Sequence, residues 1–162
     1  MQPKIVNFEA RKVAGYLHKC THENNTIPAF WQEVFADGRH EKLHSQGFVK
    51  SHSDYGVCFD GSKAGEICYL LSLEVVEGKE IPAEFVQRDL NGGEYAVMPV
   101  EGMDFGKAWG SLHEWIAKSD EYAGADTEDA FELYKCECKD GVECEACKSG
   151  NMCDVYIRVV KK

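Results

Sequence analysis

Residues 27–35 read IPAFWQEVF, and residues 105–116 read FGKAWGSLHEWI. In both stretches apolar side chains recur at the i, i+3, i+4 and i+7 spacing of one helix face. Proline is tolerated in a first helical turn, which suits Pro28, and Thr26 and Asp104 are placed to cap the two helices. The two stretches therefore predict two amphipathic α-helices.

Shorter stretches with strand-like alternation surround these helices. In chain order they are Lys4–Phe8, Val13–Leu17, Tyr55–Phe59, Ile67–Val76, Glu84–Gln87, Tyr95–Pro99, Phe131–Lys135 and Val155–Val160. A break at Glu77-Gly78-Lys79 and Pro82 separates two parts with the same order of elements: strand, helix, strand, strand. The pattern predicts a single α+β domain of two βαββ modules, residues 1–77 and 82–162, with helices on one face of an antiparallel sheet.

The composition excludes several classes of protein. The chain has 162 residues, of which 44% are hydrophobic, so it suits one globular domain with a sizeable core. Its formal charge of −10 gives no electrostatic footprint for a nucleic-acid backbone. The acids gather in residues 120–145, where ten acids and two lysines give a net charge of −8.

The N-terminal residues have no apolar run preceded by basic residues, and no later stretch has the roughly 18 apolar residues of a membrane span. We therefore expect a cytoplasmic protein that does not act at a membrane. Cysteines are kept reduced in that compartment, so a cysteine cluster indicates metal ligands or thiols before it indicates disulfides.

The cysteines cluster near the C-terminus. The spacing Cys136-x-Cys138-x5-Cys144-x2-Cys147 brings two close pairs together, which suits a tetrahedral structural zinc site. Reduced thiols and a redox-active disulfide between the last two remain open alternatives. Cys153 shares the core face of its strand by alternation. No other cofactor is expected.

His40-Glu41-Lys42-Leu43-His44 matches the HExxH string, in which two histidines one helical turn apart bind zinc and the glutamate activates water. A zinc protease places this string inside a long buried helix. Here it follows Ala36-Asp37-Gly38, where the first helix is expected to end, and Lys50 stands where extended versions have a third histidine. We expect a solvated loop or a helix extension that carries histidines, not a protease site.

Six motifs occur along the chain: Ile27-Pro28-Ala29-Phe30-Trp31-Gln32, Tyr55-Gly56-Val57, Gly93-Glu94-Tyr95-Ala96-Val97, Ala108-Trp109 with Trp115, Phe131-Glu132-Leu133-Tyr134 and Asp154-Val155-Tyr156-Ile157. In this order and spacing they resemble the GyrI-like small-molecule-binding family, the effector-binding domain of AraC-type and MerR-type transcription activators. The resemblance implies two βαββ modules related by a pseudo-two-fold axis, with a ligand cleft between them. It also implies a stand-alone member that binds amphipathic, often aromatic and cationic, drug-like or toxin-like molecules.

The chain departs from the family pattern in its last strand and in its cysteines. Many members begin this strand with Glu and have Pro at the fourth following position, whereas this chain has Asp154 and Arg158. The cysteine-rich segment is not part of the family pattern. These departures concern the identity of the ligand more than the fold.

Strand alternation predicts which side chains face the cleft. Phe131 and Leu133 share one strand face, expected to pack beneath the helices, and Glu132 and Tyr134 share the other. The resemblance places Glu132 where multidrug-responsive members carry a pocket carboxylate. The expected ligand-binding residues are Glu132, Asp154, Tyr134, Tyr156, Trp31, Tyr55, Tyr69, Tyr95 and Trp109. The alternatives are that Glu132 and Arg158 pair across neighbouring strands and that the aromatic residues are core.

Three functions use these parts. The first is binding of an amphipathic aromatic or cationic compound, because aromatic faces and a carboxylate suit a lipophilic cation. The second is hydrolysis of cyclopropane-containing or similar genotoxins, with a desolvated Glu132 as general base. The third is a gyrase-inhibitor-like interaction with a protein partner through the acidic segment.

Overall fold

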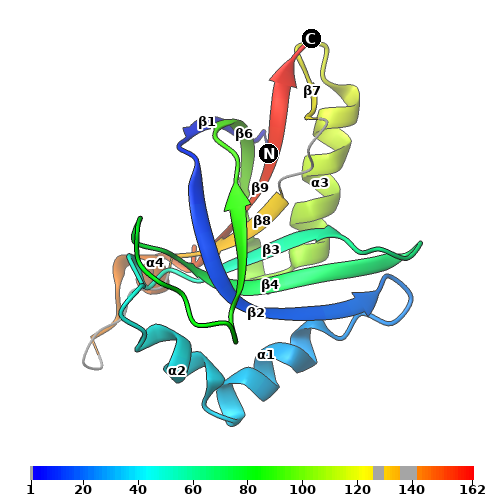
Figure 1. Cartoon of the computed structure of the whole chain (residues 1–162). Helices are drawn as coiled ribbons and strands as arrows, with labels where there is room; N and C mark the ends of the chain where they lie inside the picture. The colour runs from blue at the N-terminus through cyan, green and yellow to red at the C-terminus, as the bar shows by residue number, and fades with distance from the viewer. Residues whose placement is uncertain (1, 126–129, 136–141) are drawn as a thin grey trace. The chain divides into compact units, whose positions relative to one another are not determined.

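The computed structural model describes residues 2–125, 130–135 and 142–162. Contacts between residues divide the chain into two compact units. Figure 1 labels their helices and strands. Unit 1 comprises residues 1–10 and 91–162, and unit 2 comprises residues 11–90.

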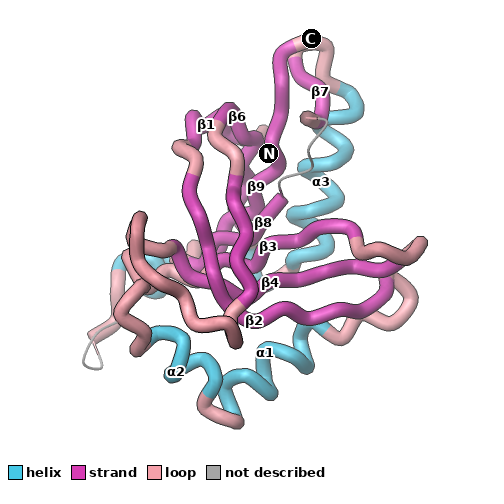
Figure 2. The backbone as a smooth tube through the Cα atoms, in the orientation of Figure 1, coloured by secondary structure: helices cyan, strands magenta, loops and turns pink. Residues whose placement is uncertain are grey.

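Unit 2 is an antiparallel sheet covered on one face by two helices. Its elements are β2 (Arg11–Thr21), α1 (Ile27–Ala36), α2 (Arg39–His44), β3 (Tyr55–Asp60), β4 (Glu66–Glu74) and β5 (Val86–Leu90). The strand order is β3-β4-β2-β5. Figure 2 shows α1 and α2 as separate helices joined by a short loop beneath this sheet. Their apolar sides meet the sheet in a core that includes Phe30, Val34, Leu43, Tyr69, Leu71 and Leu73.

Unit 1 is built in the same way around one long helix. Its elements are β1 (Lys4–Phe8), β6 (Gly93–Pro99), the short 3-10 helix η1 (Glu101–Met103), α3 (Phe105–Lys118), β7 (Tyr122–Gly124), β8 (Ala130–Tyr134), α4 (Glu145–Ser149) and β9 (Cys153–Lys161). The strand order is β1-β6-β9-β8, and β7 pairs with β9. Residues of α3 pack on Ala96, Met98, Val155, Ile157 and Val159 of the sheet.

The two units share the predicted order of strand, helix, strand, strand. This order is β2-α1-β3-β4 in unit 2, which also has β5, and β6-α3-β8-β9 in unit 1, which also has β1 and β7. The predicted α+β class, with antiparallel strands and helices on one face, is confirmed. The edge strands do not follow the predicted modules, because β1 pairs with β6 and β5 pairs with β2. The predicted module boundaries at residues 77 and 82 divide the chain by the order of its elements. The contact units instead change at residues 10 and 90.

Different residues begin and end α1. The carbonyl of Thr26 accepts the first helical hydrogen bond, but its hydroxyl bonds to His18 Nε2 at 2.7 Å. Asn25 Oδ1 instead accepts from the backbone N–H of Ile27 at 3.0 Å, so the predicted side-chain cap by Thr26 is wrong. Gly38 ends the helical path with a positive φ of 83°, a conformation that favours glycine. The predicted end of this helix is thereby confirmed.

The side chain of Asp104 caps the N-terminus of α3. Asp104 Oδ1 accepts from the backbone N–H of Lys107 at 3.0 Å, as predicted. We expect Asp104→Ala to lower the free energy of unfolding by about 1 kcal/mol, whereas Asp104→Asn retains most of it because asparagine caps equally well. Urea unfolding followed by circular dichroism measures both. Equal losses in the two variants would show that the charge of Asp104, and not its capping hydrogen bond, stabilises the helix.

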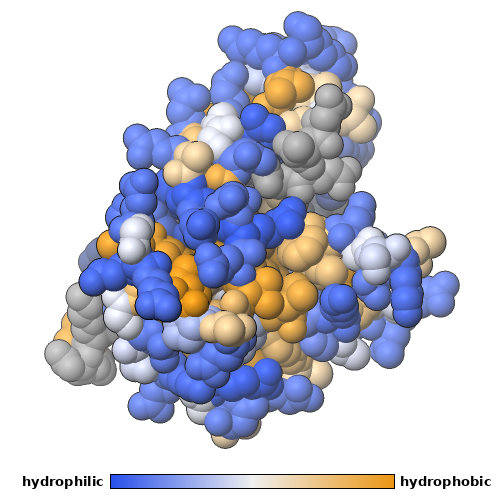
Figure 3. Space-filling view, in the orientation of Figure 1, coloured by the Kyte–Doolittle hydropathy of each residue, from blue (hydrophilic) through white to orange (hydrophobic). Residues whose placement is uncertain are grey.

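Hydrophilic residues predominate on the face shown in Figure 3, and hydrophobic residues gather in patches among them. None of the helices in the described ranges is both long and apolar enough to cross a membrane.

Candidate functional site

The register of β8 on β9 fixes which way Glu132 points. Glu132 lies directly opposite Val155, and Tyr134 lies directly opposite Cys153. Directly opposed residues in an antiparallel pair share a face of the sheet. Val155 and Cys153 belong to the core beneath α3, so Glu132 and Tyr134 lie on the α3 face. The prediction that they face away from the helices is wrong.

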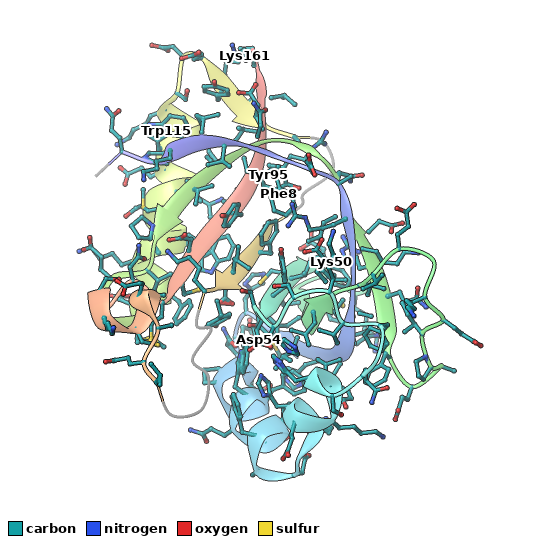
Figure 4. The ribbon with its side chains drawn as sticks, turned by 90° about the vertical axis from the view of Figure 1, so that its left-hand side faces the viewer. Phe8, Lys50, Asp54, Tyr95, Trp115 and Lys161 are labelled. Carbon is teal, nitrogen blue, oxygen red and sulfur yellow. The ribbon has the colours of Figure 1, made fainter. Side chains whose placement is uncertain are left out.

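The other face of the unit 1 sheet is also apolar, which explains the error. Phe8, Tyr95, Phe131 and Tyr156 form an aromatic cluster there, and Figure 4 labels the first two. The rings of Phe131 and Tyr156 stack with their centroids 4.6 Å apart, and Phe8 meets Tyr95 at 5.1 Å. Phe131 thus finds an apolar environment on the face away from α3, which alternation alone assigned to the polar residues.

Glu132 is a buried carboxylate beside aromatic rings. Its residue is only 6% exposed, and the described residues contain no other buried acid. The Tyr134 hydroxyl donates to Glu132 Oε2 at 3.2 Å. The ring of Phe105 in α3 lies 6.1 Å from the ring of Tyr134, and Trp109 packs against the same core. Glu132, Tyr134 and Trp109 are among the expected ligand-binding residues, and their contact with a ligand stays a prediction. Phe105 was not among them, although it begins the apolar face of its helix.

Asp154, Tyr156 and Arg158 lie on the face away from α3, as predicted from alternation. Asp154 forms an ion pair with Lys135 Nζ at 3.0 Å. Arg158 Nε donates to the carbonyl of Gly92 at 3.1 Å. Because directly opposed residues share a face, Glu132 and Arg158 lie on opposite faces. The alternative that these two charges pair across neighbouring strands is therefore wrong.

In unit 2, Trp31 and Tyr69 form one contact within the core. Trp31 Nε1 donates to the hydroxyl of Tyr69 at 2.9 Å, and Tyr69 is fully buried. Gly56 makes this possible, because a Cβ at that position would overlap the Tyr69 hydroxyl. This contact supports the alternative that Trp31 and Tyr69 are core residues. Ligand contact by either one stays a prediction.

Tyr55 points to the opposite face of the unit 2 sheet. It lies opposite Ser72, and Arg11 Nη1 donates to its hydroxyl at 3.1 Å. Burial raises the pKa of Tyr55, and the neighbouring Arg11 only partly offsets this effect. Tyr55 is therefore neutral and held in place by a cation. Its contact with a ligand likewise stays a prediction.

The predicted zinc site falls partly outside the described residues. Cys136 and Cys138 lie in the undescribed range 136–141. Cys144, which immediately precedes α4, and Cys147 in the middle of α4 are half-buried. The zinc site therefore stays a prediction. Cys153 is a core residue as predicted, and burial, with the charges of Glu132 and Asp154, raises the pKa of its thiol.

The HExxH histidines lie on α2, a six-residue helix of its own. His40 and His44 are half-buried rather than solvated, and both contact Asp54, which immediately precedes β3. Burial would raise the pKa of Asp54, but hydrogen bonds from the two histidines outweigh burial and lower it. Sequence reasoning singled out the histidines and missed Asp54. The signal that could have identified Asp54 is the stretch Ser51-His52-Ser53-Asp54, which places two further metal-ligand residues, His52 and Asp54, just before the next strand.

Solved structures resemble the chain over nearly its whole length. SAV2435 bound to tetraphenylphosphonium superposes with a TM-score of 0.73 at 14% identity, covering 99% of this chain and 94% of that one. A protein from Staphylococcus aureus MU50 gives 0.69 at 15% identity, with 98% of both chains covered. The C-terminal domain of EcmrR gives 0.62 at 10% identity, covering 99% and 98%. These likenesses confirm the fold.

A longer EcmrR chain, solved in complex with DNA, matches with a TM-score of 0.61 at 11% identity, and the match covers 99% of this chain but 58% of EcmrR. No curated protein matches the chain in sequence. The family described as the GyrI-like small molecule binding domain matches residues 1–159. The chain therefore belongs to the GyrI-like small-molecule-binding family.

Proposed function

We propose that this small-molecule-binding domain takes up amphipathic aromatic cations and that Glu132 is the acidic contact for their charge. The burial of Glu132 beside aromatic rings carries the proposal, since a carboxylate that is only 6% exposed attracts a cation more strongly than a hydrated one does. The structurally similar SAV2435 was solved with tetraphenylphosphonium, a cation of this class.

Aromatic side chains around Glu132 suit the rest of such a ligand. Tyr134 holds one oxygen of the carboxylate, and Phe105 and Trp109 supply ring surface on the same face of the sheet. An aromatic face attracts a cation through its quadrupole, and each contact contributes about 0.5–2 kcal/mol. A delocalised cation with phenyl groups would therefore find both charge and apolar surface there.

A pair of ligands with the same shape and opposite charge tests this function. We expect tetraphenylphosphonium to bind saturably in isothermal titration calorimetry and tetraphenylborate to bind at least about tenfold more weakly. The reason is that the two ions present the same phenyl surface, so the difference reports the carboxylate. Equal affinities would exclude recognition of positive charge, and absence of binding by both would contradict the proposed ligand class.

A further inference from the structure

The histidines of α2 and Asp54 converge at one point of unit 2. His40 and His44 are one helical turn apart on α2, so their side chains share a helix face. Asp54 approaches this face from the segment before β3, and Figure 4 labels it beside the helix. Three groups that are all common metal ligands thereby meet from two separate elements.

The spacing of the donor atoms suits a metal ion. His40 Nε2 lies 2.9 Å from Asp54 Oδ2, His44 Nε2 lies 2.9 Å from Asp54 Oδ1, and the two Nε2 atoms are 3.1 Å apart. Bonds of about 2.0–2.1 Å to a tetrahedral zinc ion place its ligand atoms roughly 3.3 Å apart. An outward shift of a few tenths of an ångström would therefore let the two imidazole nitrogens and one oxygen of Asp54 surround an ion.

The hydrogen bond on the far side of His44 favours the same conclusion. His44 Nδ1 lies 3.0 Å from His52 Nδ1. In the tautomer in which His44 donates its Nδ1 proton to His52, its Nε2 offers a lone pair toward His40 and Asp54. A metal ion bound there would take the place of the hydrogen bond between His44 and Asp54. Metal-bound histidines commonly use such an outer hydrogen bond to fix the tautomer.

The surroundings hold the ligands without closing the site. The side chains of His40, His44 and Asp54 are 19%, 20% and 15% exposed, so water can reach the remaining coordination positions. Leu43 is fully buried and anchors α2 to the core between the two histidines. The ring of Phe35 lies 4.3 Å from that of His40 and covers one side.

We propose that His40, His44 and Asp54 bind a divalent transition-metal ion, with zinc as the best fit, and that His52 positions His44. Two imidazoles and one carboxylate with open positions form a ligand set for zinc and related first-row ions. Glu41 is exposed on α2 and has no part in the binding. The three proposed ligands and His52 all belong to unit 2, and none of them is a cysteine or a residue proposed to contact the cation.

The test must separate this site from the cysteines. The parent protein carries serine at Cys136, Cys138, Cys144 and Cys147, has no polyhistidine tag, and is freed of metal by a chelator. We expect it to bind one zinc ion per chain in a calorimetric titration. His44→Ala and Asp54→Asn should each weaken zinc binding by at least about 100-fold, whereas His22→Ala and Glu41→Gln leave it unchanged.

Cobalt absorption gives a second measurement on the same parent protein with serine at the four cysteines. This parent should show cobalt d–d bands that disappear in His44→Ala, and thermal unfolding without metal verifies that each variant folds. His52→Ala should weaken zinc binding about tenfold, and His52→Gln, whose amide oxygen accepts the same hydrogen bond, should restore it. Absence of saturable zinc binding in the parent, or unchanged affinity in the His44 and Asp54 variants, would overturn the site. Unchanged affinity in His52→Ala would overturn the role of His52.

Discussion

Gly15→Ala is expected to lower the free energy of unfolding by at least about 3 kcal/mol. Gly15 lies in β2, between Ser72 of β4 and Val86 of β5. An added Cβ would overlap the carbonyl oxygen of Leu71 and come within 2.7 Å of the Cα of Ser72. Overpacking against side chains costs about 1–3 kcal/mol, and a backbone held on both sides cannot move aside.

Gly47→Ala is the matched control for this substitution. A Cβ at Gly47 meets nothing within 4 Å, so the variant should differ from the wild type by less than about 0.5 kcal/mol. Thermal unfolding followed by circular dichroism compares the two. If Gly15→Ala unfolds at the wild-type temperature, the close approach of β2 and β4 at this position is wrong.

Glu132→Gln is expected to weaken tetraphenylphosphonium binding by at least about 30-fold. The substitution keeps the shape of the side chain and removes its charge. Loss of one partner of a buried charge pair costs about 2–5 kcal/mol, and 2 kcal/mol corresponds to the stated change in affinity. The affinity for tetraphenylborate should not fall, because the variant removes a repulsion for that ion.

Glu121→Gln controls for the overall charge of the acidic segment. It makes the same change in charge at an exposed position of unit 1. Calorimetry should find its affinity for tetraphenylphosphonium within about twofold of the wild type, because exposed charges are screened by salt. If Glu121→Gln weakens binding as much as Glu132→Gln, the cation responds to bulk charge and Glu132 is not its contact.

The order of elements could be predicted because it depends on local periodicity. The strand Lys4–Phe8 and the start of α3 at Phe105 lie where the sequence placed them. β5 was predicted at Glu84–Gln87 but spans Val86–Leu90, because Phe85 still closes a turn on Pro82 through a backbone hydrogen bond. Such shifts arise where a turn competes with a short strand for the same residues.

The faces of β8 could not be predicted because the alternation of a strand does not say which side is buried. Phe131 suits a core, and the simplest interpretation placed that core beneath α3. The structure instead buries Phe131 in the aromatic cluster with Phe8 and Tyr156. Only the register with β9, which joins residues far apart in the sequence, decides between the two faces.

The histidine site shows a similar limit. The spacing of His40 and His44 is local and visible in the sequence. Their shared partner Asp54 comes from a different element, and its approach depends on how the chain returns from α2 to β3. The extended HExxH motif requires a third histidine where this chain has Lys50, so the sequence motif alone argues against a metal site. The fold instead brings Asp54 to the two histidines.

The exchange of edge strands has a consequence for dividing the protein into fragments. A cut between residues 77 and 82 would leave β5 in the C-terminal fragment and β1 in the N-terminal one, each separated from its pairing partner. Residues 11–90, in contrast, carry β2, β3, β4 and β5 and the pairings among them on one continuous stretch of chain. The remaining part then consists of a ten-residue peptide and residues 91–162, which would reassemble by strand addition of β1 to β6.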